Sequence, residues 1–223
     1  MIIKNTGNRE CIFFEEEDAR ILVIRPCDLR DQDDMENEVR EIQARTSVPF
    51  SLIAVPVDDW NRDLSPWEAP PVFGKEGFGS GASETLAYII DILIPAVNQD
   101  RRYQKILLGG YSLAGLFALW AGYETDVFDG IAAVSPSVWF EGWDTYREEH
   151  AFQAGCVYLS LGDKEEKTRN RTMAQVGDRI RSQAELFEKE NMPHVLEWNP
   201  GNHFKDADLR MAKGFAWLLS HMD

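Results

Sequence analysis

Short apolar runs alternate along the chain with longer segments in which apolar residues recur at helical spacing. Residues 49–57 are apolar almost throughout, which is typical of a strand covered on both faces, as in a parallel sheet. From Leu86 to Val97 the apolar residues recur at three- and four-residue intervals, which predicts a helix with one buried face and Ser83 as its cap. The same patterns predict strands at residues 12–14, 19–25, 105–110, 130–135, 156–162 and 194–198, and helices at residues 31–45, 113–123, 173–187 and 211–222.

The alternation of strands and helices sets the predicted fold class. Consecutive strands joined by helices imply right-handed crossovers and a mostly parallel sheet, so we predict a three-layer α/β fold with helices on both faces. The second strand is expected to end at Pro26, because proline has no backbone N–H for the ladder. No repeat or low-complexity linker divides the chain, and we therefore expect a single domain over residues 1–223.

Composition and charge exclude several classes of protein. The 223 residues are 44% hydrophobic and carry a formal net charge of −15, which is a globular composition with the wrong sign of charge for binding nucleic acid. No apolar run approaches the roughly 20 residues of a membrane span, and the first residues lack the pattern of an export signal. The three cysteines are widely spaced and suggest no metal site. We expect a cytoplasmic protein without metal or cofactor, in an oligomeric state that the sequence leaves open.

A serine stands where a predicted strand meets a predicted helix. Residues 110–114 read Gly-Tyr-Ser-Leu-Ala, which matches the nucleophile-elbow pattern G-x-S-x-G except for Ala114 at its last position. Such a turn exposes the hydroxyl of Ser112 at the carboxyl edge of the sheet. The amide of Leu113, in the first turn of the helix, would point toward a developing oxyanion.

An acid and a histidine follow this serine in the order that the elbow requires. In this type of fold the acid follows a later strand and the histidine follows the last strand. His203 lies in the loop after the last predicted strand, and Asp163, Glu165 and Glu166 share the loop after the strand at 156–162. We expect His203 to act as general base and favour Glu165 as its acidic partner, with Asp163 as the alternative.

The long irregular segment at residues 58–83 is a candidate for the substrate pocket, because loops of this length inside a domain are usually functional. Its aromatic side chains could form a pocket or cover the core, and Arg62 could meet a substrate carboxylate or one of the many local acids. An anionic substrate would need a local basic patch, and none stands out in the sequence. The residues that we expect to contact substrate are Trp60, Arg62, Trp67, Tyr111, Trp139 and Phe140.

Taken together, these motifs resemble the putative-esterase family of α/β-hydrolases, which includes esterase D and the siderophore trilactone esterases. The similar stretches are residues 62–67, 79–82, 109–119, 135–140 and 200–204. The resemblance implies an α/β-hydrolase fold, and the short segment between Phe140 and Gly155 leaves little room for a cap domain. The sequence departs from the family pattern at Ala114 and in the loop after the early strand. That loop has no glycine to donate the second oxyanion amide. That amide would then come from Cys27 or Asp28.

The resemblance implies a serine esterase or related acyl hydrolase, in which Ser112 attacks the carbonyl of a small-molecule ester and His203 relays the proton. The alternative is a non-catalytic protein of the same fold that binds a ligand or partner. Ala114 and the unusual oxyanion loop favour this alternative. The ordered presence of Ser112, an acid and His203 favours the enzyme.

Overall fold

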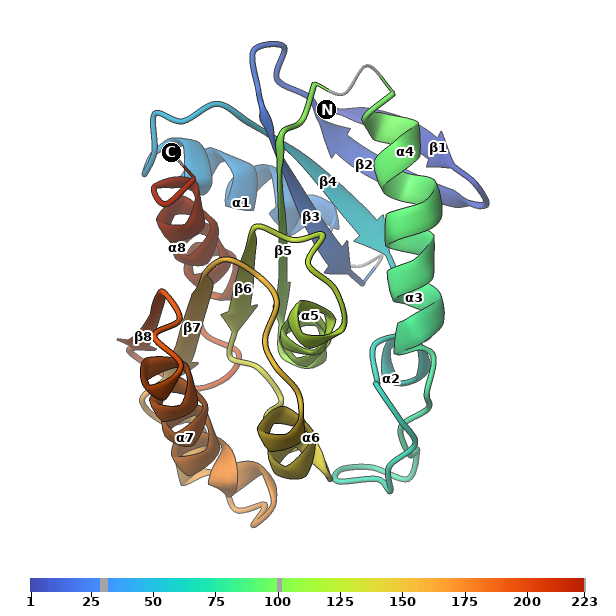
Figure 1. Cartoon of the computed structure of the whole chain (residues 1–223). Coiled ribbons are helices and arrows are strands. Elements are labelled where there is room, and N and C mark those ends of the chain that lie inside the picture. Colours follow the sequence, from blue (N-terminus) through green and yellow to red (C-terminus); the bar gives the residue numbers. More distant parts are fainter. Residues whose placement is uncertain (29–31, 100–101, 223) are drawn as a thin grey trace.

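Eight strands form a single mixed sheet in this computed structural model, which describes residues 1–28, 32–99 and 102–222 (Figure 1). The strand order is β1-β2-β4-β3-β5-β6-β7-β8, and every pairing is parallel except those of β1 with β2 and of β2 with β4. The strands are β1 (Ile2–Thr6), β2 (Arg9–Phe14), β3 (Ile21–Cys27), β4 (Phe50–Pro56), β5 (Lys105–Tyr111), β6 (Gly130–Val134), β7 (Val157–Gly162) and β8 (His194–Asn199).

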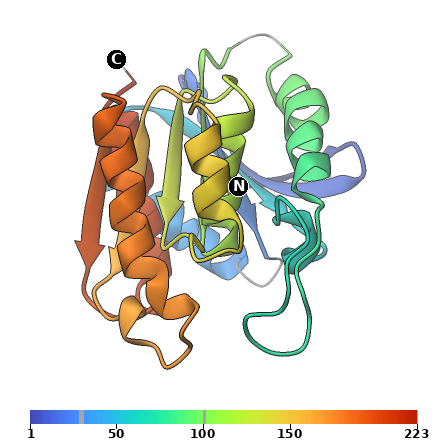
Figure 2. The same ribbon diagram turned by 60° about the horizontal axis from the view of Figure 1, so that its bottom comes forward.

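Helices cover both faces of this sheet. On one face lie α1 (Gln32–Gln43) and α8 (Ala207–Leu219), which pack against each other. The opposite face carries the other long helices, as Figures 1 and 2 show. The helices of this second layer are α3 (Ala82–Tyr88), α4 (Ile94–Val97), α5 (Leu113–Glu124), α6 (Trp143–Glu149) and α7 (Val176–Lys189).

Each central strand divides its side chains between two hydrophobic cores. In β3, Leu22 and Ile24 belong to the core beneath α3, α5 and α7, whereas Ile21 and Val23 belong to the core beneath α1 and α8. This alternation is the period-two geometry of a strand, and it explains why the strands read as continuous apolar runs. The predicted three-layer α/β architecture is confirmed.

The structure corrects two details at the amino side of the sheet. Strand β3 continues through Pro26 to Cys27, so the predicted end at Pro26 is wrong. The carbonyl of Cys27 accepts from the amide of Val57 on the β4 side; Pro26 therefore faces β5, whose pairing with β3 has already ended at Ile24. The missing N–H of Pro26 therefore removes no hydrogen bond between strands. The edge strand β1, with Ile2 and Ile3 exposed, was not predicted.

The helix predicted over residues 86–97 begins earlier and is not uniform. It starts at Ala82 with Gly81 at the N-cap and no side-chain cap, so the expected cap at Ser83 is wrong. The turns widen to π-helix over Ile89–Leu93, directly before Pro95. A proline inside a helix has no N–H to donate and crowds the preceding turn, and a wider turn is one way to relieve that crowding. The predicted helix at 31–45 corresponds to α1, although Asp31 lies outside the described residues.

The parallel strands end at the edge that Figure 2 brings forward. The long segment at 58–83 lies at this edge; before α3 begins at Ala82 it contains the short helix α2 (Trp60–Asp63) and an isolated bridge between Ala69 and Phe78. Between β6 and β7, α6 is the only helix, which agrees with the expected lack of a cap domain. No helix in the described parts of the chain is long and apolar enough to cross a membrane.

Candidate active site

A sharp turn between β5 and α5 carries Ser112. Its backbone has φ 59° and ψ −119°, in a region that non-glycine residues rarely occupy and that marks a strained, over-determined position. Two hydrogen bonds hold the turn: the amide of Ser112 donates to the carbonyl of Val134, and the carbonyl of Ser112 accepts from the amide of Ser137. The turn thus links the ends of β5 and β6 and places the hydroxyl at the carboxyl edge of the sheet.

Small residues around the turn explain how it tolerates Ala114. A Cβ atom built on Gly110 would lie 2.2 Å from the backbone carbonyl of Ala114 and 2.7 Å from its Cβ. A Cβ on Gly115 would lie 3.0 Å from the carbonyl oxygen of Gly110. Gly110 therefore has no room for a side chain, and its missing Cβ is what makes space for the methyl group of Ala114. The departure from G-x-S-x-G leaves the elbow intact.

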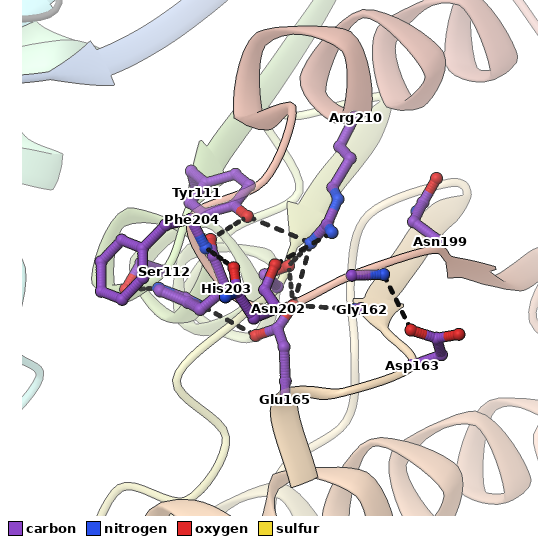
Figure 3. Close-up of polar contacts among 12 residues, drawn as sticks. Tyr111, Ser112, Gly162, Asp163, Glu165, Asn199, Asn202, His203, Phe204 and Arg210 are labelled. Atoms are coloured by element: carbon purple, nitrogen blue, oxygen red, sulfur yellow. Dashed lines mark hydrogen bonds and ion pairs between the residues drawn. The ribbon is translucent and has the colours of Figure 1, made fainter. Parts of the chain in front are cut away.

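Ser112, His203 and Glu165 lie in one hydrogen-bonded row (Figure 3). The Nε2 atom of His203 is 3.0 Å from Oγ of Ser112, and its Nδ1 atom is 2.7 Å from Oε2 of Glu165. Because an ionised carboxylate only accepts hydrogen bonds, Nδ1 donates to Glu165 and Nε2 is left to accept from the serine hydroxyl. The other candidate acid, Asp163, instead accepts from the amide of Gly201, 2.8 Å away.

Glu165 is buried, with 8% of its surface exposed. Burial acts to raise the pKa of this carboxyl group, but the hydrogen bonds and charge of His203 and the donors Ser135 and Gly162 outweigh it and hold the pKa below its ordinary value. Ser135 Oγ and the Gly162 amide each donate to Oε1 over 2.7 Å. One oxygen of Glu165 is thus held by the scaffold while the other faces His203.

Arg210, which sequence reasoning missed, joins the loops that carry the acid and the histidine. It is 2% exposed, and its Nη1 atom lies 3.0 Å from Oε1 of Glu165. Its Nη2 atom donates to the carbonyls of Pro200 and Asn202, at 3.2 and 3.0 Å, in the loop that leads to His203. A planar guanidinium can meet several acceptors at once, and here it holds the loops of Glu165 and His203 against α8.

We expect Arg210→Met to lower both stability and activity. The substitution removes the positive partner of a buried carboxylate and the donor to two loop carbonyls, and breaking a buried pair from one side costs about 3–5 kcal/mol. The melting temperature should fall by at least about 5 °C. Since the loops that carry Glu165 and His203 both lose this anchor, kcat for an ester should fall by on the order of 10²-fold, whereas KM should change little.

Thermal unfolding and steady-state kinetics with an ester test this expectation, with Arg210→Lys as the charge-conserving variant. Lysine keeps the charge without the planar fork, so kcat and stability should both recover only in part. An unchanged kcat in folded Arg210→Met would show that Arg210 is structural only.

Tyr111 lies beside His203 and takes part in holding it. Its hydroxyl donates to the carbonyl of His203 over 2.6 Å and accepts from Arg210 over 3.3 Å, and the two rings pack with centroids 5.3 Å apart. Burial raises the pKa of the Tyr111 phenol, so the group stays neutral. Tyr111 also lines a hollow of about 310 Å³ next to Ser112.

The predicted oxyanion donors are placed unequally. Leu113 lies at the first position of α5 and lines the cavity in front of Ser112; the first amides of a helix have no acceptor within it. Cys27 is buried at the end of β3, and neither it nor Asp28 lines that cavity. The following residues, 29–31, lie outside the described part of the chain. A second donor from Cys27 or Asp28 stays a prediction.

A cavity of about 600 Å³ opens in front of Ser112 and His203. Two of the predicted substrate contacts, Trp60 and Trp139, line it. The other lining residues are mainly aromatic, aliphatic or small polar side chains together with two lysines and Glu165, namely Asn61, Phe73, Phe78, Leu113, Ser135, Ser137, Lys164, Glu165, Lys167, Thr168, Met173, Val176, Asn202 and Phe204. The site can therefore hold a largely apolar small molecule next to the serine hydroxyl.

Four predicted substrate contacts do not line this cavity, among them Tyr111, which lines the neighbouring hollow instead. Phe140 is fully buried in the core. The indole N–H of Trp67 donates to the carbonyl of Glu141 over 2.8 Å. Arg62 pairs with Asp63 and Glu84, which is the local ion pairing that its acidic surroundings favour.

Ser135 and Arg210 are the contacts of Glu165 that the sequence did not indicate. A signal for Arg210 was present: it lies within the apolar stripe of α8, next to Met211 and one turn before Gly214, and a charge on a buried helix face usually has a partner. For Ser135, at φ 46° after β6, no sequence signal distinguishes its role. No group of three or more potential metal ligands occurs within residues 1–28, 32–99 and 102–222.

Comparisons with known proteins identify a family and a fold for this chain. Residues 31–210 match the family described as Putative esterase, and a search of curated proteins finds no match. Among solved structures, the siderophore hydrolase EstA from Aspergillus nidulans superposes with a TM-score of 0.76 at 20% identity, over 92% of this chain and 84% of its own.

Two further solved structures share the fold. The siderophore hydrolase EstB from Aspergillus nidulans has a TM-score of 0.71 at 15% identity, over 99% of this chain and 95% of its own. The enterobactin esterase FES from Shigella flexneri has a TM-score of 0.68 at 12% identity, over 100% of this chain and 59% of its own. At these identities the likeness establishes an α/β-hydrolase fold and carries no substrate with it.

Proposed function

Because the chain belongs to the putative esterase family, we propose that it is a serine hydrolase that cleaves carboxylic esters through an acyl-enzyme on Ser112. The observation that carries this proposal is the row from Ser112 through His203 to Glu165 at the wall of a cavity. Nucleophile, base and orienting acid within hydrogen-bond reach of one another are the signature of nucleophilic catalysis.

The proposed reaction begins with Ser112. Its Oγ attacks the ester carbonyl carbon while its proton passes to Nε2 of His203, and Glu165 stabilises the imidazolium that forms. The carbonyl oxygen becomes an oxyanion within reach of the Leu113 amide and the positive end of α5. When the C–O bond to the alcohol breaks, the leaving alkoxide takes the proton from His203. Water then repeats these steps on the acyl-enzyme, releasing the acid and restoring Ser112.

Labelling with a fluorophosphonate, read as intact mass, tests this proposal directly. The wild type should gain one adduct per chain, whereas Ser112→Ala should gain none and His203→Ala should react far more slowly. Ser137→Ala is the matched control, because Ser137 lines the same cavity and holds the turn at Ser112 through its backbone amide, which the substitution keeps. Circular dichroism establishes that each variant is folded, since the strained turn at Ser112 could respond to substitution.

The alternative is a non-catalytic protein of this fold that binds a ligand in the same cavity. Absence of an adduct on folded wild type would reject the proposed mechanism and leave this alternative. An adduct would direct work to substrates: short-chain and aryl esters, together with siderophore esters, because two of the solved relatives are named siderophore hydrolases and a third an enterobactin esterase.

A further inference from the structure

A basic segment borders the candidate active site in a chain whose net charge is −15. It follows β7 and comprises residues 164–171, which we call the basic rim. Two of its cations, Lys164 and Lys167, line the cavity that contains Ser112. Its remaining cations, Arg169 and Arg171, are exposed. In the sequence, acidic or polar residues separate these four cations, so the segment does not form a continuous basic run.

The carboxylates nearest in sequence do not neutralise the basic rim. Asp163 accepts from the amide of Gly201, Glu165 is buried and turned toward His203 and Arg210, and Glu166 pairs with Arg181 over 2.9 Å. Within the described residues, no carboxylate forms an ion pair with any of the four rim cations. Apart from Glu165, no acidic side chain lines the cavity. The cavity therefore has a positive border in an otherwise acidic protein.

The backbone of the basic rim is held in place at both ends. The amide of Lys164 donates to the carbonyl of Gly201 in the histidine loop, 3.1 Å away. The side chain of Asn170 donates to the carbonyl of Val72 over 2.7 Å and accepts from the amide of Thr172 over 3.0 Å. The lysines thus extend from an ordered segment that also contacts the long loop at 58–83, and less ordering is needed when a ligand binds.

Aromatic residues form another part of the cavity wall. Phe73, Phe78 and Trp139 pack together with ring centroids 6.0–6.4 Å apart. Phe73 is 55% exposed and Phe204 is 88% exposed, although both line the cavity. Exposed aromatic side chains at the border of a pocket indicate contact with a ligand. An apolar body bound here would lie within the same cavity as Lys164 and Lys167.

We propose that this cavity selects esters that bear a negative charge, which Lys164 and Lys167 bind while the aromatic wall holds the apolar part. The inference rests on the proposed esterase function and adds a substrate class to it. An ester with a neutral polar group in place of the charge should be bound more weakly, because the rim cations form no ion pair with a carboxylate of the described residues. Arg169 and Arg171 extend the positive field outward and favour the approach of anions against the overall charge of the protein.

Matched pairs of chromogenic esters test this selection. One pair is 4-nitrophenyl hydrogen glutarate and 4-nitrophenyl valerate, which differ by a carboxylate on the acyl side; the other is 4-acetoxybenzoic acid and its methyl ester, which differ on the alcohol side. We expect the wild type to prefer the anionic member of at least one pair in kcat/KM. In Lys164→Gln/Lys167→Gln, kcat/KM for that anionic ester should fall by about five- to tenfold, and for its neutral partner by less than about twofold.

The matched control is Lys4→Gln/Lys189→Gln, which removes the same charge from positions that do not line the cavity. This control should change kcat/KM for the anionic and for the neutral ester by less than about twofold. Added salt should reduce the preference of the wild type for the anionic ester. Equal rates for charged and neutral esters in both pairs, or an unchanged preference in the Lys164→Gln/Lys167→Gln variant, would overturn the inference. Hydrolysis of the neutral esters and the fluorophosphonate adduct would persist in that case, so failure of the selection is distinct from failure of the esterase function.

Discussion

His203→Ala is expected to lower kcat/KM for an ester by on the order of 10⁶-fold, the loss that removal of a catalytic base causes in serine hydrolases. Without Nε2, which lies 3.0 Å from Oγ of Ser112, no group takes the serine proton during attack or returns it to the leaving alcohol. Initial rates with 4-nitrophenyl acetate measure the effect. His150→Ala serves as control, because His150 is exposed and stacks on Tyr146, and its rate should not change.

The double variant Ser112→Ala/His203→Ala gives a stricter test of this first prediction. Residues that act as one unit are strongly non-additive, so the double variant should be no slower than either single variant. The remaining rate reflects binding and the oxyanion donors alone. Losses that multiply would mean that Ser112 and His203 act independently, which contradicts the proposed proton relay.

Glu165→Gln is expected to lower kcat/KM by on the order of 10⁴-fold, although the substitution hardly changes the size and shape of the side chain. The glutamine carbonyl can still accept from Ser135, Gly162 and Arg210, but its NH₂ group then faces Nδ1 of His203. Nδ1 must accept that hydrogen bond, so the ring proton moves to Nε2, which can no longer take the proton of Ser112. The same ester assay measures this loss.

Asp163→Asn is the matched control for Glu165→Gln, because the two acids share one loop. Asp163 accepts from the Gly201 amide, and an asparagine oxygen can do the same, so kcat/KM should fall by only a few fold. If Asp163→Asn caused the larger loss and Glu165→Gln the smaller, the acid of the relay would be Asp163.

Stability against pH gives a second readout for Glu165. Its pKa is below the ordinary value in the folded protein, so its carboxylate contributes stability that is complete above the ordinary pKa of about 4.3 and is lost as the pH falls through the lowered folded value. Glu165→Gln lacks this contribution. The difference in melting temperature between wild type and variant should therefore be larger at pH 7 than at pH 3, as measured by thermal unfolding.

Much of the fold could be predicted because its strands and helices are strongly periodic. The central strands are buried on both faces, and their continuous apolar runs mark them even without neighbours in view. The edge strand β1 was missed because Ile2 and Ile3 are exposed, so its residues follow no burial pattern. The passage of β3 through Pro26 depends on which neighbour has already stopped pairing, and that information is absent from the local sequence.

The sequence by itself determined the fold class, the elbow at Ser112 and the order of serine, acid and histidine. These features are local: each depends on a strand, the turn that follows it and the residue types that the turn admits. The missing Cβ of Gly110, which leaves room for Ala114, is also a local feature of this kind. Such features can be identified from residue pattern because their physical causes lie within a few positions of the chain.

Only the tertiary structure decided which side chains meet at the site. Glu165 rather than Asp163 contacts His203, Arg210 joins both loops from α8, and Lys164 and Lys167 border the cavity. Arg62 turns instead to Asp63 and Glu84. These pairings join segments far apart in the sequence, and a side chain's partner there depends on strand register, sheet twist and helix docking. Hydrophobic periodicity indicates which residues are buried but not which partners their side chains contact. The contacts that complete the site are therefore determined only when the layers pack together.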